Sequence, residues 1–153
     1  MSADALPIII GCDHGAFTLK ETIRKHLAQS GYPVEDAGAF GTESVDYPDV
    51  AHRLAERVAG GEFARGILLC GTGIGMSIAA NKVTGIRASL CTSVDAARTT
   101  VQHNDSNVIC ISGDGTDWGI AEAMVDAWLA AEFEGGRHGR RVDLITAYEN
   151  RRD

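Results

Sequence analysis

Cys70 and the glycines that follow it are the residues best suited to chemistry. The apolar run 67–69 predicts a buried parallel strand, residues 71–75 read G-T-G-I-G, and residues 76–82 predict the start of a helix. A turn from a strand into a helix leaves backbone N–H groups unpaired, and these groups bind anions together with the positive end of the helix dipole. We therefore expect Cys70 to act as a base or nucleophile in its thiolate form. The alternative is a buried structural thiol, which is how most free cysteines behave.

The spacing of this loop disfavours several familiar sites. G-x-G-x-G is not the G-x-G-x-x-G of dinucleotide-binding folds, and no G-x-x-x-x-G-K-[ST] nucleotide loop occurs in the chain. A thiol phosphatase would place an arginine six residues after its cysteine, where this chain has Met76. A phosphatase is therefore a remote alternative, which release of inorganic phosphate would revive.

Two pairs of polar residues adjoin other predicted strands. Asp13 and His14 follow the first strand, and His103 and Asn104 lie in the turn before the fifth. Ligands bind beyond the carboxyl ends of parallel strands, so we expect the first pair, and also the second, to converge on the cysteine loop. A carboxylate beside an imidazole can relay a proton, and histidine can act as acid or base near neutral pH. The alternatives are a helix cap at Asp13 and solvated histidines.

A cluster of basic residues lies near the C-terminal end of an acidic chain. The net charge of −7 argues against nucleic-acid and membrane-surface partners, but a small anion needs only a local cluster. Arg137 and Arg141 are four residues apart, so they share a helix face if the last helix starts early, and they could then grip one phosphate. The alternative is a solvated basic patch.

Apolar strands alternate with amphipathic helices along the whole chain. This order predicts a parallel sheet covered on both faces, in a three-layer α/β/α sandwich of the Rossmann-like α/β class. The 153 residues form one predicted domain, 1–153, with a C-terminal helix over 142–152. Lys20 is expected on the polar side of the first helix, and Asp117 and either Ser93 or Asp95 are expected helix caps. The predicted strands are 7–11, 32–37, 67–70, 86–91 and 107–112.

The cysteines and the termini indicate a compartment. The four cysteines form no C-x-x-C pair and no zinc-like grouping with histidines, as expected of reduced intracellular thiols. The N-terminus shows no signal peptide, and no apolar run approaches the ~20 residues that span a bilayer. We expect a cytoplasmic protein without a membrane partner.

Several motifs together resemble one family, the type B ribose-5-phosphate isomerases with the related galactose- and allose-6-phosphate isomerases. The motifs keep the family's order and cover nearly the whole chain, which makes them far more specific together than singly. They are G-C-D-H at 11–14, D-Y-P at 46–48, C-G-T-G-I-G at 70–75, I-A-A-N-K at 78–82, G-I-R at 85–87, H-N-D at 103–105 and G-G-R-H at 135–138 with Arg141.

The resemblance implies a metal-free, cofactor-free aldose–ketose isomerisation of a sugar phosphate through a cis-enediolate. It also implies a homodimer or homotetramer whose site takes His103 and Asn104 from the partner subunit. The implied roles are Cys70 as base, Thr72 with the N–H groups of Gly71, Gly73, Ile74 and Gly75 at the enediolate, His103 for ring opening, Asp13 at the ring oxygen or hydroxyls, Asn104 at a hydroxyl, Tyr47 lining the pocket, and His14, Arg137 and Arg141 at the phosphate.

One residue departs from the family pattern. Asp114 occupies the place of an arginine that helps to hold the phosphate, and an anion there is unfavourable by about 1 kcal/mol or more in a partly buried site. We expect ribose 5-phosphate and ribulose 5-phosphate as the substrate pair. The alternatives are another phosphorylated sugar of four to six carbons, such as allose or galactose 6-phosphate or erythrose 4-phosphate, and a non-catalytic sugar-phosphate sensor.

Overall fold

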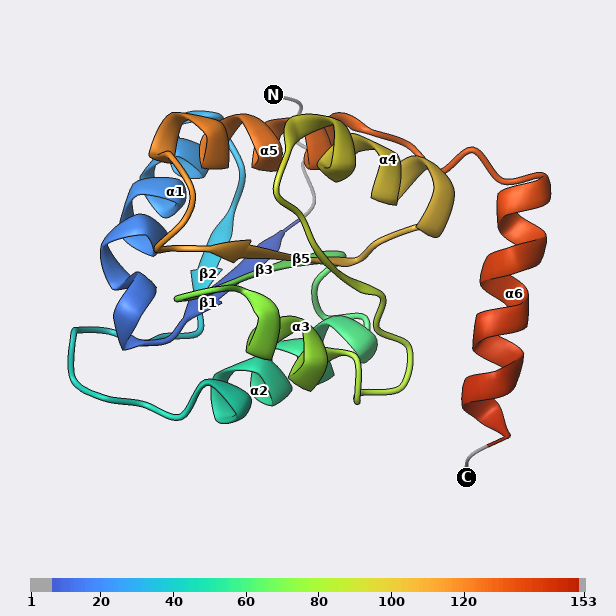
Figure 1. Ribbon diagram of the computed structural model, residues 1–153, viewed down its shortest axis with the longest axis horizontal. Coiled ribbons are helices and arrows are strands. Elements are labelled where there is room, and N and C mark those ends of the chain that lie inside the picture. The colour runs from blue at the N-terminus through green and yellow to red at the C-terminus, as the bar shows by residue number, and fades with distance from the viewer. Residues whose placement is uncertain (1–6, 152–153) are drawn as a thin grey trace.

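A five-stranded parallel sheet forms the centre of the protein (Figure 1). The computed structural model describes residues 7–151, and the strand order is β2-β1-β3-β5-β4. The predicted parallel sheet is therefore confirmed, with the short strands at its two edges. The strands are β1 (Ile8–Cys12), β2 (Val34–Asp36), β3 (Arg65–Cys70), β4 (Ala88–Leu90) and β5 (Val108–Ser112).

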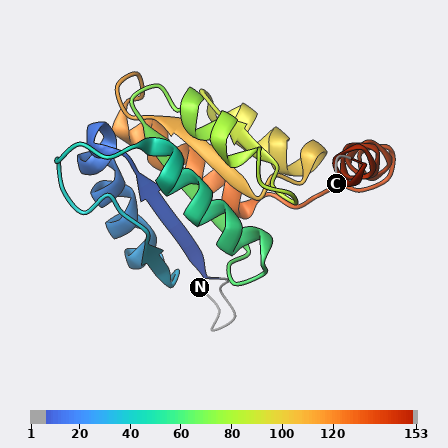
Figure 2. The same cartoon turned by 90° about the horizontal axis from the view of Figure 1, so that it is seen from below.

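Helices cover both faces of this sheet and make the three layers that the sequence predicts. One face carries α1, α4 and α5, and the opposite face carries α2 and α3 (Figures 1 and 2). A sixth helix, α6, stands beside the layers. The bounds are α1 (Phe17–Gln29), α2 (Tyr47–Ala59), α3 (Ile74–Ala80), α4 (Val94–Asn104), α5 (Trp118–Ala130) and α6 (Arg137–Asn150), with a short 3-10 helix at His14–Ala16.

The central strands are apolar throughout because both of their faces are buried. In β3, Ile67 and Leu69 pack in the core beneath α1, α4 and α5, whereas Leu68 and Cys70 pack in the core above α2 and α3. Each fully buried leucine or isoleucine stabilises the fold by roughly 1.5–3 kcal/mol relative to exposure. This alternation holds β3 at the middle of the sheet and fixes the direction in which its last residue, Cys70, points.

Two helix caps confirm sequence predictions. The Asp117 carboxylate accepts a hydrogen bond from the Ile120 N–H at 3.2 Å, at the start of α5. Of the two candidate caps for α4, Ser93 is the one observed, since its hydroxyl oxygen accepts from the Ala96 N–H at 3.0 Å. Both caps satisfy an N–H group that a helix start leaves without a partner.

The last two helices differ from their predicted bounds. His103 and Asn104 were expected in a turn, but they form the last residues of α4, and Asp105, with a left-handed φ of 51°, is the C-cap residue that follows. The final helix begins at Arg137, ahead of the predicted start at residue 142, because Gly135 and Gly136 both take positive φ and turn the chain immediately before it. The predicted end at residue 152 lies outside the described residues.

Lys20 corrects the predicted polar face of α1. Its side chain is fully buried, and its ammonium group donates to both carboxylate oxygens of Asp36, at 2.8 and 2.7 Å, and to the Ala39 carbonyl at 2.5 Å. The rings of Phe17 and Phe40 flank the ammonium at 5.2 and 5.3 Å. Helical spacing alone does not distinguish a solvated lysine from one that ties a helix to an edge strand.

Helix α6 projects from the layered body. Its principal helix contact is with α4, and both views show it standing apart beyond the segment 131–136 (Figures 1 and 2). Leu144, Ile145 and Tyr148 on α6 are 56%, 54% and 65% exposed, which is unusual for three large apolar side chains on one helix. Among residues 7–151, no helix combines the length and apolar character needed to cross a membrane.

Candidate active site

Cys70 ends β3 at the carboxyl edge of the sheet, beside Ser112 at the end of β5. The side chain is buried, and its Sγ accepts a hydrogen bond from the Gly73 N–H at 3.1 Å. Within residues 7–151, no other cysteine sulfur accepts a hydrogen bond from a backbone N–H. The loop therefore turns back over the thiol, as the strand–glycine–helix pattern predicts.

The backbone at Gly73 can be formed only by glycine. Its φ is +76°, and a Cβ there would lie 2.7 Å from Leu90 Cδ1 and 3.0 Å from the carbonyl carbon of Ile111. A side chain at this position would push the loop off β4 and β5 and break the hydrogen bond to the Cys70 sulfur. The contacts with β4 and β5 therefore restrict residue 73 to a backbone conformation and a size that only glycine provides.

Not every N–H group of the loop is free to meet a ligand. The Gly73 N–H points at the cysteine sulfur, and the Ile74 N–H donates to the Thr72 hydroxyl oxygen at 3.2 Å. Tyr47 closes one side, because a Cβ on Gly75 would lie 2.6 Å from its ring. The cysteine loop and Tyr47, which the family resemblance assigns to one site, therefore lie together at the end of β3.

The other three cysteines are structural thiols. Burial raises the pKa of Cys12 and of Cys91 to about 11, and it raises the pKa of Cys110 still further. All three side chains lie in the hydrophobic core. Cys70 is distinguished from them by its position at the mouth of the glycine loop.

Asp13 and His14 reach the same edge of the sheet from the end of β1. Asp13 caps the short helix after β1, since its Oδ1 accepts from the Gly15 N–H at 3.0 Å, and its backbone N–H donates to the Leu69 carbonyl at 3.0 Å. His14 is exposed, and its Nδ1 accepts from the Val45 N–H at 3.2 Å. The capping alternative is therefore correct for Asp13, and its second carboxylate oxygen is not used by the cap.

Asp114 lies directly against the cysteine loop. Its backbone N–H donates to the Gly71 carbonyl at 3.0 Å, and its Oδ2 lies 2.8 Å from the position of a Cβ on Gly71. The exposed carboxylate lines an open cleft of about 620 Å³ together with Thr72 and Ser112. A negative charge therefore stands where the cleft begins.

The remaining predicted site residues lie at the opposite edge of the sheet. Helix α4 runs from the carboxyl end of β4 to the amino end of β5, so His103 and Asn104 precede the start of β5. The arrowheads in Figure 1 point away from α6, which carries Arg137 and Arg141. The five residues of β5, about 13 Å, separate the two edges. The expectation from spacing that His103 and Asn104 converge on the cysteine loop of their own chain is therefore wrong, because α4 runs antiparallel to the strands. The arrangement leaves open the role that the family resemblance implies for them, as residues supplied by a partner subunit.

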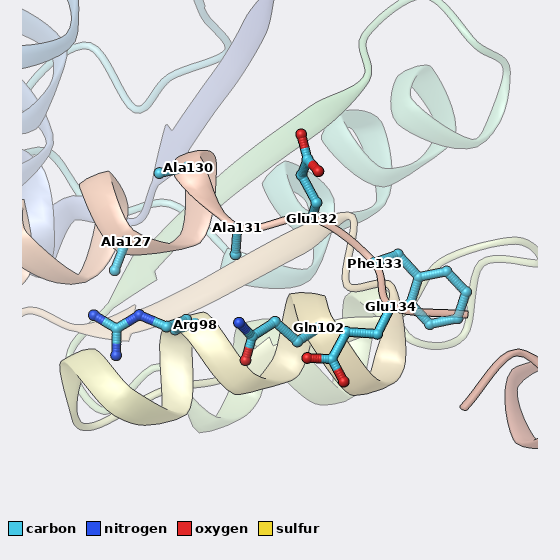
Figure 3. A pocket seen from close by; sticks show the side chains of 8 residues that line it. All are labelled: Arg98, Gln102, Ala127, Ala130, Ala131, Glu132, Phe133 and Glu134. Atoms are coloured by element: carbon cyan, nitrogen blue, oxygen red, sulfur yellow. The ribbon is translucent and has the colours of Figure 1, made fainter. Parts of the chain in front are cut away.

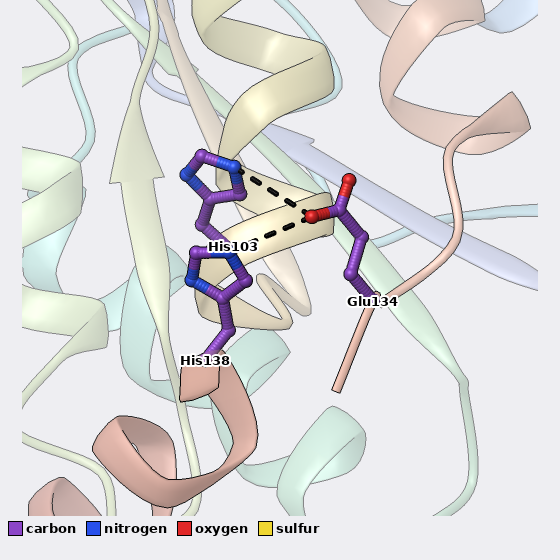
Figure 4. A group of neighbouring side chains, drawn as sticks. All are labelled: His103, Glu134 and His138. Atoms are coloured by element: carbon purple, nitrogen blue, oxygen red, sulfur yellow. Dashed lines mark ion pairs between the residues drawn. The ribbon is translucent and has the colours of Figure 1, made fainter. Parts of the chain in front are cut away.

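Two residues near His103, Glu134 and His138, were not among the predicted site residues, although His138 belongs to the G-G-R-H motif. The buried imidazole of His138 stacks on His103, and the Glu134 carboxylate lies within 3.9 Å of both rings (Figure 4). Their i,i+4 spacing gives no helical signal, because Glu134 precedes α6, and it is the turn at Gly135 and Gly136 that brings the two side chains together. One nitrogen or oxygen atom from each of these three side chains lies within 4.8 Å of the other two, a spacing found in metal sites as well as in ion-pair clusters.

Comparison with known proteins identifies the family. Residues 8–145 match the family described as Ribose/Galactose Isomerase. The chain belongs to this family. It is 49% identical over 146 residues to the ribose-5-phosphate isomerase B of Escherichia coli K12, covering 95% of this chain and 98% of that protein. It is 44% identical to the D-erythrulose-4-phosphate isomerase of Pectobacterium atrosepticum, covering 95% and 96%.

Solved structures of relatives share the whole fold. The ribose-5-phosphate isomerase B of Clostridium thermocellum superposes with a TM-score of 0.95 at 48% identity, covering 97% of this chain and 100% of that one. The enzyme of Mycoplasma genitalium, solved with bound ribulose 5-phosphate, gives 0.91 at 41% identity, covering 94% and 96%. The family resemblance expected from the motifs is confirmed, and the protein is an isomerase.

Proposed function

We propose that this protein interconverts ribose 5-phosphate and ribulose 5-phosphate, with Cys70 as the proton-transferring base. The observation that carries the proposal is the thiol at the end of β3, to whose sulfur the Gly73 N–H donates at 3.1 Å, while the adjoining loop residues Gly71 and Thr72 line an open cleft. A base that must act between two adjacent carbons needs a fixed position more than it needs reach. The glycine loop, which its contacts with β4 and β5 hold in one conformation, supplies that fixed position.

The reaction needs no co-reactant. The Cys70 thiolate removes the proton from C2 of the open-chain aldose, and the C–H electron pair forms the C1=C2 bond of a cis-enediolate. The same thiol then returns a proton to C1, and a proton passes from O2 to O1, which gives the ketose. The Thr72 hydroxyl and the loop N–H groups that are not used internally (Gly71 and Gly75 among them) face the oxygens on which negative charge develops.

A second copy of the chain would complete the site. One chain holds Cys70, Asp13, His14 and Tyr47 at one edge of the sheet, and its His103 and Asn104 at the other. The exposed apolar side chains of α6 favour a homodimer or a larger homo-oligomer that covers them. In that assembly the partner subunit's His103 opens the furanose ring, and the partner's Arg137 and Arg141, one turn apart on α6, hold the phosphate with His14.

Asp114 favours a second candidate substrate. Its carboxylate lines the cleft where the family carries a cation, so a sugar phosphate of different length or stereochemistry is the alternative. The 44% identity to a D-erythrulose-4-phosphate isomerase supports a four-carbon sugar phosphate as one such substrate. A gain of ribose 5-phosphate turnover in Asp114→Arg would favour this second substrate class.

Proton exchange in D₂O tests the proposal directly. Ribose 5-phosphate is incubated with the oligomeric protein, and NMR follows deuterium at C2 together with the appearance of ribulose 5-phosphate. Exchange with product supports the proposed pair, and its loss in Cys70→Ala, with the fold intact, supports the assigned base. Absence of exchange from a folded oligomer, while erythrose 4-phosphate or a hexose 6-phosphate is turned over, would move the assignment to that substrate. Ligand binding without exchange of any sugar phosphate would leave only a sensor.

A further inference from the structure

His103, Glu134 and His138 form a compact cluster at the end of α4 (Figure 4). The two imidazole rings are stacked, with centroids 4.0 Å apart and planes 9° from parallel. Glu134 Oε1 lies 3.9 Å from His103 Nε2 and 3.5 Å from His138 Nε2. One oxygen of the Glu134 carboxylate thus lies near the Nε2 atom of both rings. The reaction described above assigns no role to this carboxylate.

The backbone holds both neighbours of His103 in place. The Glu134 N–H donates to the Gln102 carbonyl at 3.0 Å, which fastens the segment after α5 to the last turn of α4. The His138 N–H donates to the Gly135 carbonyl at 3.0 Å, and its ring is buried although most of α6 is exposed. Glu134 also ends the pocket between α4 and α5, where its side chain lies beside Gln102 (Figure 3).

Parallel rings do not suit a metal ion. A metal lies in the plane of each imidazole that binds it and separates its ligands by roughly 109° in a tetrahedral site, so the two ring planes converge on it. The planes of His103 and His138 are 9° from parallel and their centroids are 4.0 Å apart, so nitrogen lone pairs lying in these two planes do not meet at one point. One of these rings would have to turn out of the stack to bind an ion.

The surroundings of His138 favour its neutral form. Burial, with further contributions from His103 and Arg137, lowers the pKa of His138 below its usual value. The Arg137 Nε also lies 3.5 Å from His138 Nε2, a position that a neutral ring can accept from. Around the cluster the charged groups are Glu134, Arg137 and Arg141, and the carboxyl end of the α4 dipole adds negative character at His103.

We propose that His138 and Glu134 are positioning residues, which hold the His103 imidazole in the orientation that opens the sugar ring. The inference rests on the proposed function, because it concerns the histidine that serves that reaction. His138 limits tilting of the His103 ring by stacking, and Glu134 directs its Nε2. Only the free face and the opposite edge of His103 then remain for the substrate.

Ring opening is chemically separate from isomerisation. The C1 hydroxyl of the furanose loses its proton to a base, its O–H electron pair forms C1=O1, the C1–O4 bond breaks, and O4 takes a proton from an acid. Ribulose 5-phosphate bypasses this step, since its O5 is phosphorylated and cannot close a furanose ring. Exchange of its C1 proton with solvent therefore reports Cys70 and the phosphate grip but not the orientation of His103.

The test compares these two reactions in matched variants of the full oligomeric protein. Glu134→Gln keeps the shape of the side chain and removes its charge, His138→Ala removes the stacking plane, and His138→Phe restores a plane without nitrogen. Glu132→Gln is the control, because in the described part of the chain Glu132 makes no ion pair. Turnover of furanose ribose 5-phosphate and C1 deuteration of ribulose 5-phosphate in D₂O are measured for each variant.

If these variants misorient the His103 ring, turnover of the furanose should fall while C1 proton exchange of ribulose 5-phosphate is retained. Glu134→Gln and His138→Ala should slow turnover of the furanose on the order of ten-fold or more and leave C1 exchange within about two-fold of the parent. His138→Phe should recover most of the turnover lost in His138→Ala, and Glu132→Gln should match the parent.

Equal losses in both reactions would overturn the inference, because they would mean that α6 and its phosphate contacts had been disturbed instead. Unchanged turnover in Glu134→Gln and His138→Ala would overturn it as well. A parent protein that neither turns over the furanose nor exchanges the C1 proton would remove the proposed function itself, and the roles of both residues would fall with it.

Discussion

Complementation between two inactive variants tests the division of the site between the edges of the sheet. Cys70 belongs to the carboxyl edge and His103 to the amino edge, about 13 Å away along β5. Cys70→Ala and His103→Ala each remove one half of the site, so each variant alone should fail to turn over ribose 5-phosphate. When both chains are produced in the same cell with different tags, mixed dimers form.

The arrangement of the chains sets the size of the recovery. In a mixed dimer, one site combines both substitutions, and the other combines an intact Cys70 with the partner's intact His103. Random pairing makes about half of the dimers mixed, and one of the two sites in each is whole, so activity should recover to roughly one quarter of the parent value. A site contained within one chain would give no recovery.

The assay follows ketose formation from ribose 5-phosphate in the mixed sample and in each variant purified alone. The matched control mixes Cys70→Ala with the double variant Cys70→Ala/His103→Ala, since no pairing of these two chains restores a whole site. Mass spectrometry of the intact oligomer gives the fraction of mixed dimers against which the recovery is scaled.

Activity in the mixture that does not exceed the sum of the two separate variants would refute the shared site. Recovery well above one quarter, with a normal fraction of mixed dimers, would refute the assignment of one cysteine and one histidine to each site. Recovery in the Cys70→Ala control would show that another group serves as the base.

Three further predictions concern stability. Gly73→Ala should lower the free energy of unfolding by about 2–4 kcal/mol, whereas Gly61→Ala, also at positive φ but with open space around it, should cost about 1 kcal/mol; urea unfolding compares the two. Lys20→Met should cost about 3–5 kcal/mol in the same assay, because it strands the partly buried Asp36 carboxylate, and a loss below about 1 kcal/mol would contradict the ion pair's importance. Stability should fall as pH rises from 9.0 towards 11, because burial raises the pKa of folded Cys91 from 9.0 to about 11 and only the unfolded chain releases that proton earlier. Cys91→Ala should make this slope shallower without abolishing it, because the buried thiols of Cys12 and Cys110 act in the same direction, and an unchanged slope would exclude the Cys91 thiol as one of its sources.

The sequence predicted the features that depend on local pattern. Continuous apolar runs are required wherever a parallel strand is covered on both faces, so the central strands were readily recognised. The Asp117 cap and the glycine loop after Cys70 follow from backbone requirements that few residue types meet. These features locate the part of the candidate site that lies around Cys70 at the end of β3.

The features that depend on tertiary contacts could not be predicted from pattern alone. Lys20 has the spacing of a solvated helix residue and is buried only because Asp36 and the Ala39 carbonyl meet it. His103 and Cys70 lie on opposite edges because α4 runs antiparallel to the strands, and the motifs record only their order along the chain. The stack of His138 on His103 needs the early start of α6, which two glycines at positive φ produce.

The contacts of the cysteine loop also bear on how such an enzyme can diverge. Gly73 is confined by Leu90 and by the backbone at Ile111, so a change there damages the fold before it can alter the chemistry. Asp114, by contrast, fixes the loop through its backbone N–H, while its exposed carboxylate is free to be exchanged. A position that the fold constrains, Gly73, and a position whose side chain is free to change, Asp114, thus lie close to the same loop. If Asp114 helps to select the sugar phosphate, as proposed, a descendant of this chain could change its substrate by replacing one exposed side chain and keep the proposed base, Cys70, unaltered.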